Sequence, residues 1–463
     1  MTSWIPDLSG QDGLQYERLA DAIAEAVRRG ELAPGAKLPP QRDLAWKLGL
    51  AVGTVSRAYQ LAEQRRLVSG QVGRGTYVLD PAAERGEAGS DGGVIDLVQN
   101  VPCVASQVPA LAAALGEMAR MPGLGRLLGY QPENGHARYR AAGAAWVKRA
   151  GLELPPDRLM LTGGAQHALA IALLALSRPG EAVLTERLTF HGVADAIAVG
   201  GARAVGVAID EEGAVPADLD RAARATGARL VFLTPTVHSP TTGTMGAKRR
   251  AEIARVLNAR DLVLIEDDVY GYLPAERPAP IACHARERVI YVASVSKCLG
   301  PGLRVAWMAA PDALRDRLRE ALRATALRLP AFGPEIAARW IENGTAERLV
   351  QELRRDTAAR FAIVESAFKG LAWRGRPDAL HAFADLPARW RDDRFAAEAE
   401  RRGVRVCAAR EFAVDGADAP NAFRIALGAP RDHATLKRAL DTLAHLAASA
   451  PAAEPETARR HVV

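Results

Sequence analysis

The sequence contains few cysteines, and they form no metal-binding or disulfide pattern. Its 463 residues include four, which lie far apart without a C-x-x-C pair: Cys103, Cys283, Cys298 and Cys407. A structural zinc site would show closely spaced pairs, and a disulfide framework would show a short chain dense in cysteine. We therefore expect no metal, and a location in a reducing compartment, the cytoplasm.

Long apolar stretches are also missing. No uncharged apolar run approaches the length that spans a bilayer, and residues 1–7 have neither the basic nor the apolar region of a secretory signal. With 49% hydrophobic and 25% charged residues, the composition is that of a soluble globular protein. The length predicts two or three domains, and we expect no contact with a membrane.

The formal net charge of +6 is small for this length, but positive charge gathers near the N-terminus. Between residues 42 and 76, six basic residues stand against two acidic ones. They are Arg42, Lys47, Arg57, Arg65, Arg66 and Arg74 against Asp43 and Glu63. Such a local excess is suited to phosphate contacts.

Composition divides the chain near residue 80. Residues 80–93, DPAAERGEAGSDGG, hold no large apolar side chain and are rich in Gly, Asp and Glu, as flexible linkers are. We expect a small module over residues 12–79 and a large one over residues 94–446. Residues 447–463 are rich in Ala, Pro and Glu, which predicts a disordered tail.

Helical spacing followed by strand-like alternation runs through the small module. Leu19, Ile23 and Val27 predict a first helix; a second begins near Pro40, and a third covers residues 54–66 after a glycine-containing turn. The stretch LVSGQVGRGTYVL then predicts a β-hairpin with Arg74 at its tip. This order predicts a helix-turn-helix with a wing.

The outward residues of this module suit DNA. Thr54 and Arg57 would reach base edges from a helix in the major groove, while Arg42 and Arg74 would hold phosphates. A bare helix-turn-helix pattern would also fit a helical bundle used for protein contacts. However, the run GELAPGAKLPPQRDLAWKLGLAVGTVSRAYQLAEQRRLVSGQVGRGTYV resembles the winged helix of the GntR transcription factors. The resemblance implies operator DNA as a partner and these four residues as contacts.

From about residue 94, short apolar runs alternate with polar or Gly/Pro-rich loops. Examples are RLVFLTP, DLVLIEDD and RVIYVASVSK. The rhythm predicts an α/β domain with a largely parallel sheet, whose ligands bind at the carboxyl ends of the strands.

Several predicted strand ends carry polar residues. The pair Gly163 and Gly164 precedes an apolar helix, where free amides and the helix dipole attract a phosphate. A plain turn between a strand and a helix explains these glycines equally well. Residues 266–268 are three adjacent acids, which require a bound cation, a salt bridge or a helix cap. Arg424 lies in an apolar, strand-like run and needs an anionic partner.

Lys297, in SVSKCLGPGLR, is followed seven residues later by Arg304. Taken alone, this lysine would be a solvated loop charge, and Phe190 in TERLTFHG would be mere packing. In their order and spacing, however, the motifs of residues 95–445 resemble the fold-type I aminotransferases, which bind pyridoxal 5′-phosphate. A winged helix fused to such a domain resembles the MocR subfamily of GntR regulators. The predicted fold is therefore an N-terminal winged helix-turn-helix joined by a flexible linker to an α/β fold-type I, aminotransferase-like domain that binds this coenzyme.

The resemblance implies a role for each motif residue. Lys297 would join the coenzyme aldehyde covalently, Asp267 would pair with the ring nitrogen, and Tyr270 would hydrogen-bond the phenolic oxygen. The phosphate would be held by Gly164, Ala165, Gln166, Ser294 and Arg304. Phe190 would stack on the ring, and Arg424 would bind the α-carboxylate of an amino-acid ligand. Tyr130, in GYQPENG, would reach the phosphate of a neighbouring subunit, which implies a homodimer.

Two departures from the family pattern stand out. Ser239 precedes Pro240 where the family usually has asparagine, and the glycine of that loop comes late, at Gly243. Coenzyme contact from this loop is therefore in doubt. Asp268 also competes with Asp267 for the ring nitrogen, and the spacing to Tyr270 favours Asp267.

These patterns leave three functions open. The first is a transcriptional regulator that senses an amino acid, an amine or the coenzyme itself. The second is an active aminotransferase with a DNA-binding appendage. The third is a degenerate coenzyme fold that only scaffolds DNA binding, which the presence of Lys297, Asp267, Tyr270 and Arg304 together argues against.

Overall fold

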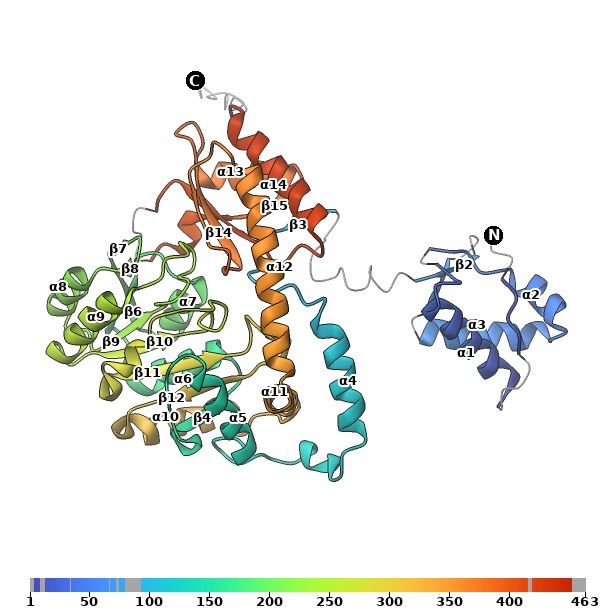
Figure 1. The fold of residues 1–463 in the computed structure, drawn as a ribbon, viewed down its shortest axis with the longest axis horizontal. Helices are drawn as coiled ribbons and strands as arrows, with labels where there is room; N and C mark the ends of the chain where they lie inside the picture. Colours follow the sequence, from blue (N-terminus) through green and yellow to red (C-terminus); the bar gives the residue numbers. More distant parts are fainter. Residues whose placement is uncertain are drawn as a thin grey trace, which may run out of the picture. The chain divides into compact units, whose positions relative to one another are not determined.

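The computed structural model describes residues 4–8, 13–33, 35–65, 67–71, 75–79, 93–414 and 419–451. The chain divides into two compact units, Met1–Gly92 and Gly93–Val463 (Figure 1). This division falls inside the predicted linker, of which residues 80–92 lie outside the described part of the chain.

The first unit contains three helices and a hairpin. They are α1 (Gln15–Arg28), α2 (Gln41–Leu48), α3 (Val52–Gln64), β1 (Val68–Gln71) and β2 (Gly75–Val78). Leu19, Ile23 and Val55 are fully buried and hold the helices together. Gly49 ends α2 with a left-handed φ of 65°. The third helix begins at Val52, two residues before the predicted Thr54, and the extended Ala51 is its N-cap.

A seven-stranded sheet forms the centre of the second unit, in the order β4-β12-β11-β10-β9-β5-β6. Strand β12 runs antiparallel to both neighbours, and the other adjacent pairs are parallel. The bounds are β4 (Leu159–Thr162), β5 (Ala182–Glu186), β6 (Arg203–Val207), β9 (Leu230–Leu233), β10 (Val263–Asp267), β11 (Val289–Ser294) and β12 (Ala306–Ala309). All six residues of β11 are buried, as expected of a strand covered on both faces.

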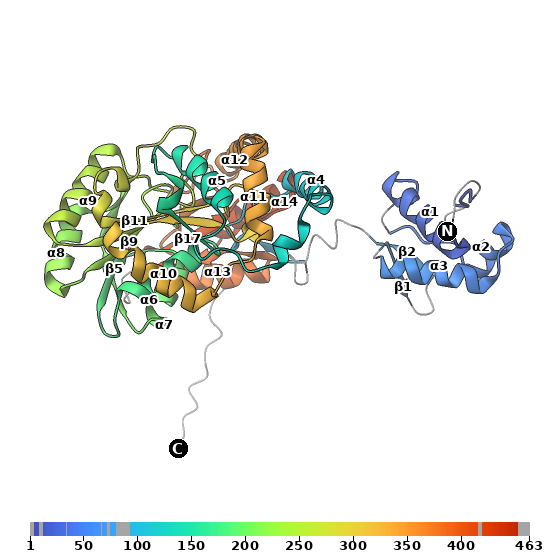
Figure 2. The same ribbon diagram turned by 90° about the horizontal axis from the view of Figure 1, so that it is seen from below.

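Helices cover both faces of this sheet. Figure 2 shows α5 (Ala137–Lys148) and α9 (Ala247–Ala259) on one side, and α6 (Ala165–Leu176), α7 (His191–Val199) and α10 (Asp312–Ala326) on the other. The remaining elements around the sheet are α4 (Gln107–Ala119), β7 (Ile209–Asp210), β8 (Gly213–Ala214), α8 (Pro216–Thr226) and α11 (Phe332–Glu342). No described helix combines the length and hydropathy needed to cross a bilayer.

A second, four-stranded antiparallel sheet follows the order β13-β14-β17-β16. The sheet and its two helices consist of β13 (Trp373–Arg374), β14 (His381–Asp385), α13 (Asp392–Arg401), β16 (Cys407–Ala408), β17 (Ala422–Ala426) and α14 (His433–Ala448). We call this part the C-terminal lobe. The part built on the seven-stranded sheet is called the core lobe. The long helix α12 (Thr345–Ala367) leads into the C-terminal lobe, and β15 (Val404–Arg405) pairs with β3 (Ile95–Asp96). Helix α14 ends at Ala448, two residues into the predicted tail, and residues 452–463 lie outside the described part.

Candidate functional site

Lys297 lies in the loop that follows β11, beside the carboxyl ends of the parallel strands. Its Nζ donates a hydrogen bond to the backbone carbonyl of Asn100 at 2.5 Å and lies 5.5 Å from the centre of the Tyr270 ring. Burial and, to a smaller extent, the charge of Arg424 lower the pKa of Lys297 to about 8, while Asp267 opposes the shift. Near neutral pH the amine therefore has an accessible uncharged form, as attack on an aldehyde requires.

Asp267 ends β10 in the same buried region. Its Oδ1 is inaccessible to solvent and has no hydrogen-bond partner among the described residues. Burial and, to a smaller extent, the charge of the neighbouring Asp268 raise the pKa of this carboxyl to about 7. A buried carboxyl oxygen without a donor is costly, so its surroundings fit a bound group that presents a protonated ring nitrogen.

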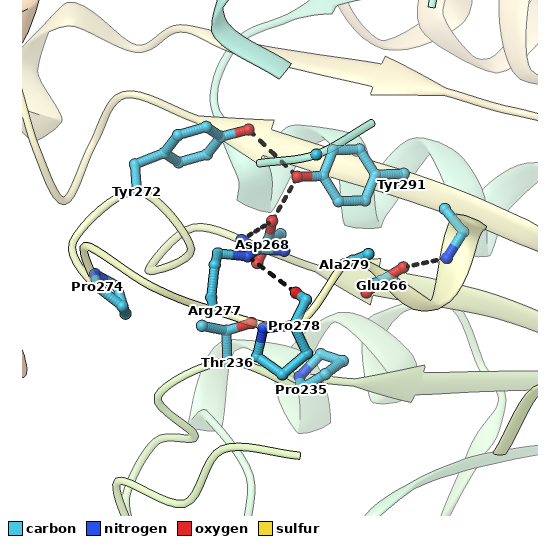
Figure 3. Close-up of polar contacts among 12 residues, drawn as sticks. Pro235, Thr236, Glu266, Asp268, Tyr272, Pro274, Arg277, Pro278, Ala279 and Tyr291 are labelled. Atoms are coloured by element: carbon cyan, nitrogen blue, oxygen red, sulfur yellow. Dashed lines mark hydrogen bonds and ion pairs between the residues drawn. The ribbon is translucent and has the colours of Figure 1, made fainter. Parts of the chain in front are cut away.

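The other two acids of this triplet are engaged within the protein (Figure 3). Asp268 forms an ion pair with Arg277 at 2.6 Å and accepts a hydrogen bond from the Tyr291 hydroxyl. Glu266 accepts the backbone N–H groups of residues 281 and 282 at 2.8 and 2.9 Å. The salt-bridge explanation therefore holds for Asp268, whereas Asp267 has no charged partner within ion-pair distance in the part of the chain that the structure describes.

Gly164 and Arg304 meet at the N-terminus of α6. Gly164 has a φ of 93°, and a Cβ at this position would lie 2.8 Å from a guanidinium nitrogen of Arg304. That guanidinium donates to the carbonyl of Gly163 at 3.0 Å. A cation beside free helix amides forms a cradle that fits a phosphate.

Two predicted phosphate ligands have other partners in this structure. The Gln166 side chain donates to the carbonyl of Gly192 at 2.8 Å. Ser294 is fully buried, and its hydroxyl donates to the carbonyl of Val305 at 3.0 Å and bonds Ser296 at 2.9 Å. Ser296, which directly precedes Lys297 in S-x-S-K, is the less buried of the two serines, although only Ser294 was predicted to hold the phosphate.

Arg424, on β17, is only 2% exposed yet has no carboxylate within ion-pair distance among the described residues. Its guanidinium donates to the carbonyl of Val98 and, at 3.4 Å, to the hydroxyl of Ser239. It stacks 4.8 Å from the centre of the Phe412 ring, and its Nε has no partner. A buried guanidinium of this kind fits an anionic ligand.

The loop before α9 departs from the family pattern at two positions. The bond between Ser239 and Pro240 is cis, and Thr242 adopts a left-handed φ of 66°. A Cβ on Gly243 would lie 2.6 Å from the carbonyl oxygen of Glu211, so the late glycine is required by this close approach. Ser239 hydrogen-bonds Tyr270 and thus keeps the loop in contact with the site.

Two predicted residues are more exposed. Phe190, which precedes α7, is 36% exposed and lies 4.6 Å from the His191 ring. Tyr130 is 85% exposed in the segment between α4 and α5.

Three of the four predicted DNA-binding residues, Arg42, Thr54 and Arg57, lie on α2 and α3. Arg42 and Arg57 are exposed and Thr54 is half-buried, while Val55 and Tyr59 turn to the core. Arg74 lies outside the described residues. Trp46 on α2 is 85% exposed and was not singled out from the sequence.

Comparison with known proteins decides the family. Residues 92–443 match the model of aminotransferase class I and II. The chain belongs to this family. Residues 15–78 match the gntR family of bacterial regulatory proteins, and together the two matches confirm the predicted MocR-type arrangement.

The relatives of this aminotransferase-family regulator include other regulators. The HTH-type transcriptional regulator YdeF of Bacillus subtilis is 29% identical over 96% of both chains. YdcR of Escherichia coli is 30% identical, over 67% of this chain and 72% of its own. The vitamin B6 salvage pathway transcriptional repressor PtsJ of Salmonella typhimurium is 29% identical, over 68% of this chain and 71% of its own.

Among solved structures, an archaeal alanine:glyoxylate aminotransferase matches with a TM-score of 0.71 and 25% identity. The match covers 79% of this chain and 93% of that protein. These comparisons confirm the predicted fold and the prediction of a DNA-binding transcriptional regulator. The coenzyme of the family is pyridoxal 5′-phosphate, which confirms the predicted cofactor.

Three further site residues of this regulator were not predicted from the sequence: Asn100, Glu186 and His381. The Asn100 amide bonds the Tyr270 hydroxyl at 2.8 Å and His381 Nδ1 at 3.1 Å. Glu186 ends β5; its Oε1 accepts the N–H of Thr234 at 3.0 Å, and burial raises its pKa to about 8. Of these three, only Glu186 could have been found from the sequence, because it is an acidic residue at the end of the strand-like run AVLTE. Among the described residues, no cluster of His, Cys, Asp and Glu could hold a metal ion.

Proposed function

We propose that this chain regulates transcription by sensing, through bound pyridoxal 5′-phosphate, an amino acid or amine, or by sensing the coenzyme itself. The observation that carries the proposal is the charge pattern at Lys297, Asp267 and Arg424. A lysine with a lowered pKa, a carboxyl oxygen without a donor and a guanidinium without an anion among the described residues interact electrostatically at one partly buried site. Each is unfavourable alone, and each matches one part of the coenzyme or of an amino acid.

When bound, the coenzyme supplies an aldehyde that condenses with amines and a ring that withdraws electrons. Lys297 would provide the attacking amine, and Asp267 would accept the N–H of the ring. Tyr270 would hydrogen-bond the phenolic oxygen, with Phe190 against the ring. Gly164, Ala165, Gln166, Ser294 and Arg304 would hold the phosphate, which for Gln166 and Ser294 requires exchange of the hydrogen bonds described above.

Arg424 and Lys297 belong to different lobes, so a ligand that engages both favours one arrangement of the lobes. Arg424 lies on β17 of the C-terminal lobe, and Lys297 follows β11 of the core lobe. A ligand can shift an equilibrium only by its difference in affinity for the two states. A carboxylate on Arg424 would provide that difference, and the first unit would carry the change to DNA through Arg42, Thr54, Arg57 and Arg74.

A homodimer supports this function in two ways. Tyr130 and Leu128 are 85% and 83% exposed, and Val108 and Leu115 of α4 are 41% and 47% exposed, which leaves apolar side chains for a second copy. Such a dimer would bring Tyr130 to a neighbouring phosphate and would pair two winged helices on two half-sites.

A regulator of transcription also acts where the chromosome is, which supports the cytoplasmic location.

A working aminotransferase remains the second candidate. The lowered pKa of Lys297 and the guanidinium of Arg424, which has no carboxylate partner among the described residues, favour it, because both groups serve transamination as well as sensing. The relatives named as regulators favour the first function.

The visible absorbance of the coenzyme-loaded protein tests the proposal. We would compare wild type, Lys297→Ala and, as a matched control, Lys248→Ala at an exposed site on α9. Amino acids and amines would be added while keto acids and operator affinity are measured. A band that requires Lys297, shifts with one ligand and changes operator affinity without steady product supports the sensor. Continuous product with unchanged operator affinity supports the enzyme, and the absence of a Lys297-dependent band refutes coenzyme binding at this lysine.

A further inference from the structure

The His381 imidazole provides the starting point, because its hydrogen bonds determine its tautomer. Its Nε2 lies 3.1 Å from the carbonyl oxygen of His238, in the loop that contains the cis bond. A carbonyl can only accept, so Nε2 carries the proton. Burial, aided by Arg424, lowers the pKa of His381 to about 3, so the ring is neutral near pH 7. Nδ1 is therefore an acceptor.

The tautomer of His381 in turn fixes the orientation of Asn100. The atom of Asn100 that lies 3.1 Å from His381 Nδ1 must be the amide nitrogen, since an acceptor needs a donor. The second N–H of that amide then points to the Tyr270 oxygen at 2.8 Å. Asn100 is 8% exposed, and its Oδ1 has no partner among the described residues.

Tyr270 consequently receives hydrogen bonds at its oxygen. Burial raises the pKa of Tyr270 to about 12, and hydrogen bonds from Asn100 and with Ser239 oppose that shift. The Asn100 amide nitrogen can only donate, so the hydrogen of Tyr270 is not used in that contact and can be donated to a bound group. The backbone carbonyl of Asn100 also accepts a hydrogen bond from Lys297 Nζ, so one residue contacts both Tyr270 and Lys297.

We propose that Asn100 and His381 are positioning residues that orient the Tyr270 hydroxyl as a donor to the coenzyme. The chain from the His238 carbonyl through His381 and Asn100 joins the core lobe to β14. Strand β14 lies beside β17, and Phe383 of β14 is directly opposite Arg424. The same chain therefore connects the carboxylate-binding strand to Tyr270. This proposal rests on the proposed coenzyme site at Lys297.

The pH midpoint of the coenzyme's visible absorbance tests this role directly. Donation from Tyr270 stabilises the form with a negatively charged phenolic oxygen, and a hydroxyl that accepts hydrogen bonds is a stronger donor. The charged and titratable groups around the chain are Lys297, Tyr270, Asp267, Arg424, His238 and His381. Asn100→Ala and the isosteric Asn100→Asp should raise the midpoint by about one pH unit.

The matched control is Asn134→Ala, because Asn134 is another partly buried asparagine with an unpartnered Oδ1. Its midpoint should equal that of wild type. The double variant Asn100→Ala/Ser239→Asn returns a carboxamide to Tyr270 from the neighbouring loop and should recover most of the shift. A double variant that stays shifted would show that packing, not the amide donor, determines the effect, and would overturn the proposal.

A double-variant cycle tests the chain itself. The effects of Asn100→Ala and His381→Leu on the midpoint should be less than additive, because each interrupts the same chain. Additive effects, or an Asn100→Asp midpoint equal to wild type, would overturn the assignment. Failure of the underlying function is recognised separately, because wild type would then lack the Lys297-dependent band.

Discussion

Glu186→Gln should stabilise the protein increasingly as the pH rises. Glu186 is fully buried at the end of β5, and one of its oxygens has no hydrogen-bond partner among the described residues. Burial raises its pKa from 4.5 to about 8, so the folded protein keeps a proton that the unfolded chain releases above pH 4.5. Wild type therefore loses free energy of unfolding as the pH rises from about 4.5 to 8.

The magnitude follows from this window. At pH 7 the solution is about 2.5 pH units above the unfolded pKa of 4.5 and still below the folded pKa. At about 1.36 kcal/mol per unit, the loss of unfolding free energy is roughly 3 kcal/mol. Glutamine keeps the oxygen that accepts the Thr234 N–H and removes the titration. Near pH 4.5 this contribution to the difference between variant and wild type should vanish. Other buried groups titrate in both proteins and largely cancel in the difference.

Urea unfolding of the full chain at pH 5 and pH 7.5, followed by tryptophan fluorescence, measures the effect. The control is Glu365→Gln, at an exposed position on α12, whose difference from wild type should not vary with pH. A Glu186→Gln difference that is the same at both pH values would refute the reasoning, because it would mean that Glu186 ionises equally in the folded and unfolded chain.

Three further predictions concern DNA binding and folding. Arg57→Ala should weaken operator binding by about 1–3 kcal/mol if the side chain reads a base edge, and an unchanged affinity would remove it from the readout. Arg74→Ala should weaken binding to any sequence and reduce the slope of log affinity against log salt by about one; a loss confined to the operator would contradict a phosphate contact. Arg277→Met leaves the Asp268 charge buried without its ion pair and should lower the free energy of unfolding by about 3–5 kcal/mol. Adding Asp268→Asn should recover much of that loss in urea unfolding, and no recovery would mean that the ion pair is not the cause.

Sequence motifs predicted the parts of the site whose spacing along the chain is regular. Asp267 ends β10 and Lys297 follows β11, the neighbouring parallel strand, so their approach could be expected from strand ends alone. The sequence could not assign the three acids at residues 266–268 individually. The backbone of residues 281–282 binds Glu266, and Arg277 binds Asp268, through a loop whose path no periodicity encodes.

Asn100 and His381 were beyond prediction for a related reason. Asn100 lies 170 residues from Tyr270 and 281 from His381 along the chain, and neither residue belongs to a motif. Their contact depends on how the C-terminal lobe packs on the core lobe. The sequence also could not distinguish Ser294 from Ser296, because burial of a hydroxyl depends on the strand register rather than on residue type.

The division of the site between two lobes bears on which ligands could act as signals under the proposed function. An amine without a carboxylate would engage Lys297 in the core lobe but would leave Arg424 without its anion. An α-amino acid would engage both and would remove the cost of a buried, unpaired guanidinium only when the lobes are close. Since regulation requires a difference in affinity between two arrangements, the amino acid has a means of shifting the equilibrium that the simple amine lacks. Arg424 lies on β17, which pairs with the strand that carries His381, so under the proposed function a movement of β17 toward a bound carboxylate would also change the hydrogen bonds of Tyr270.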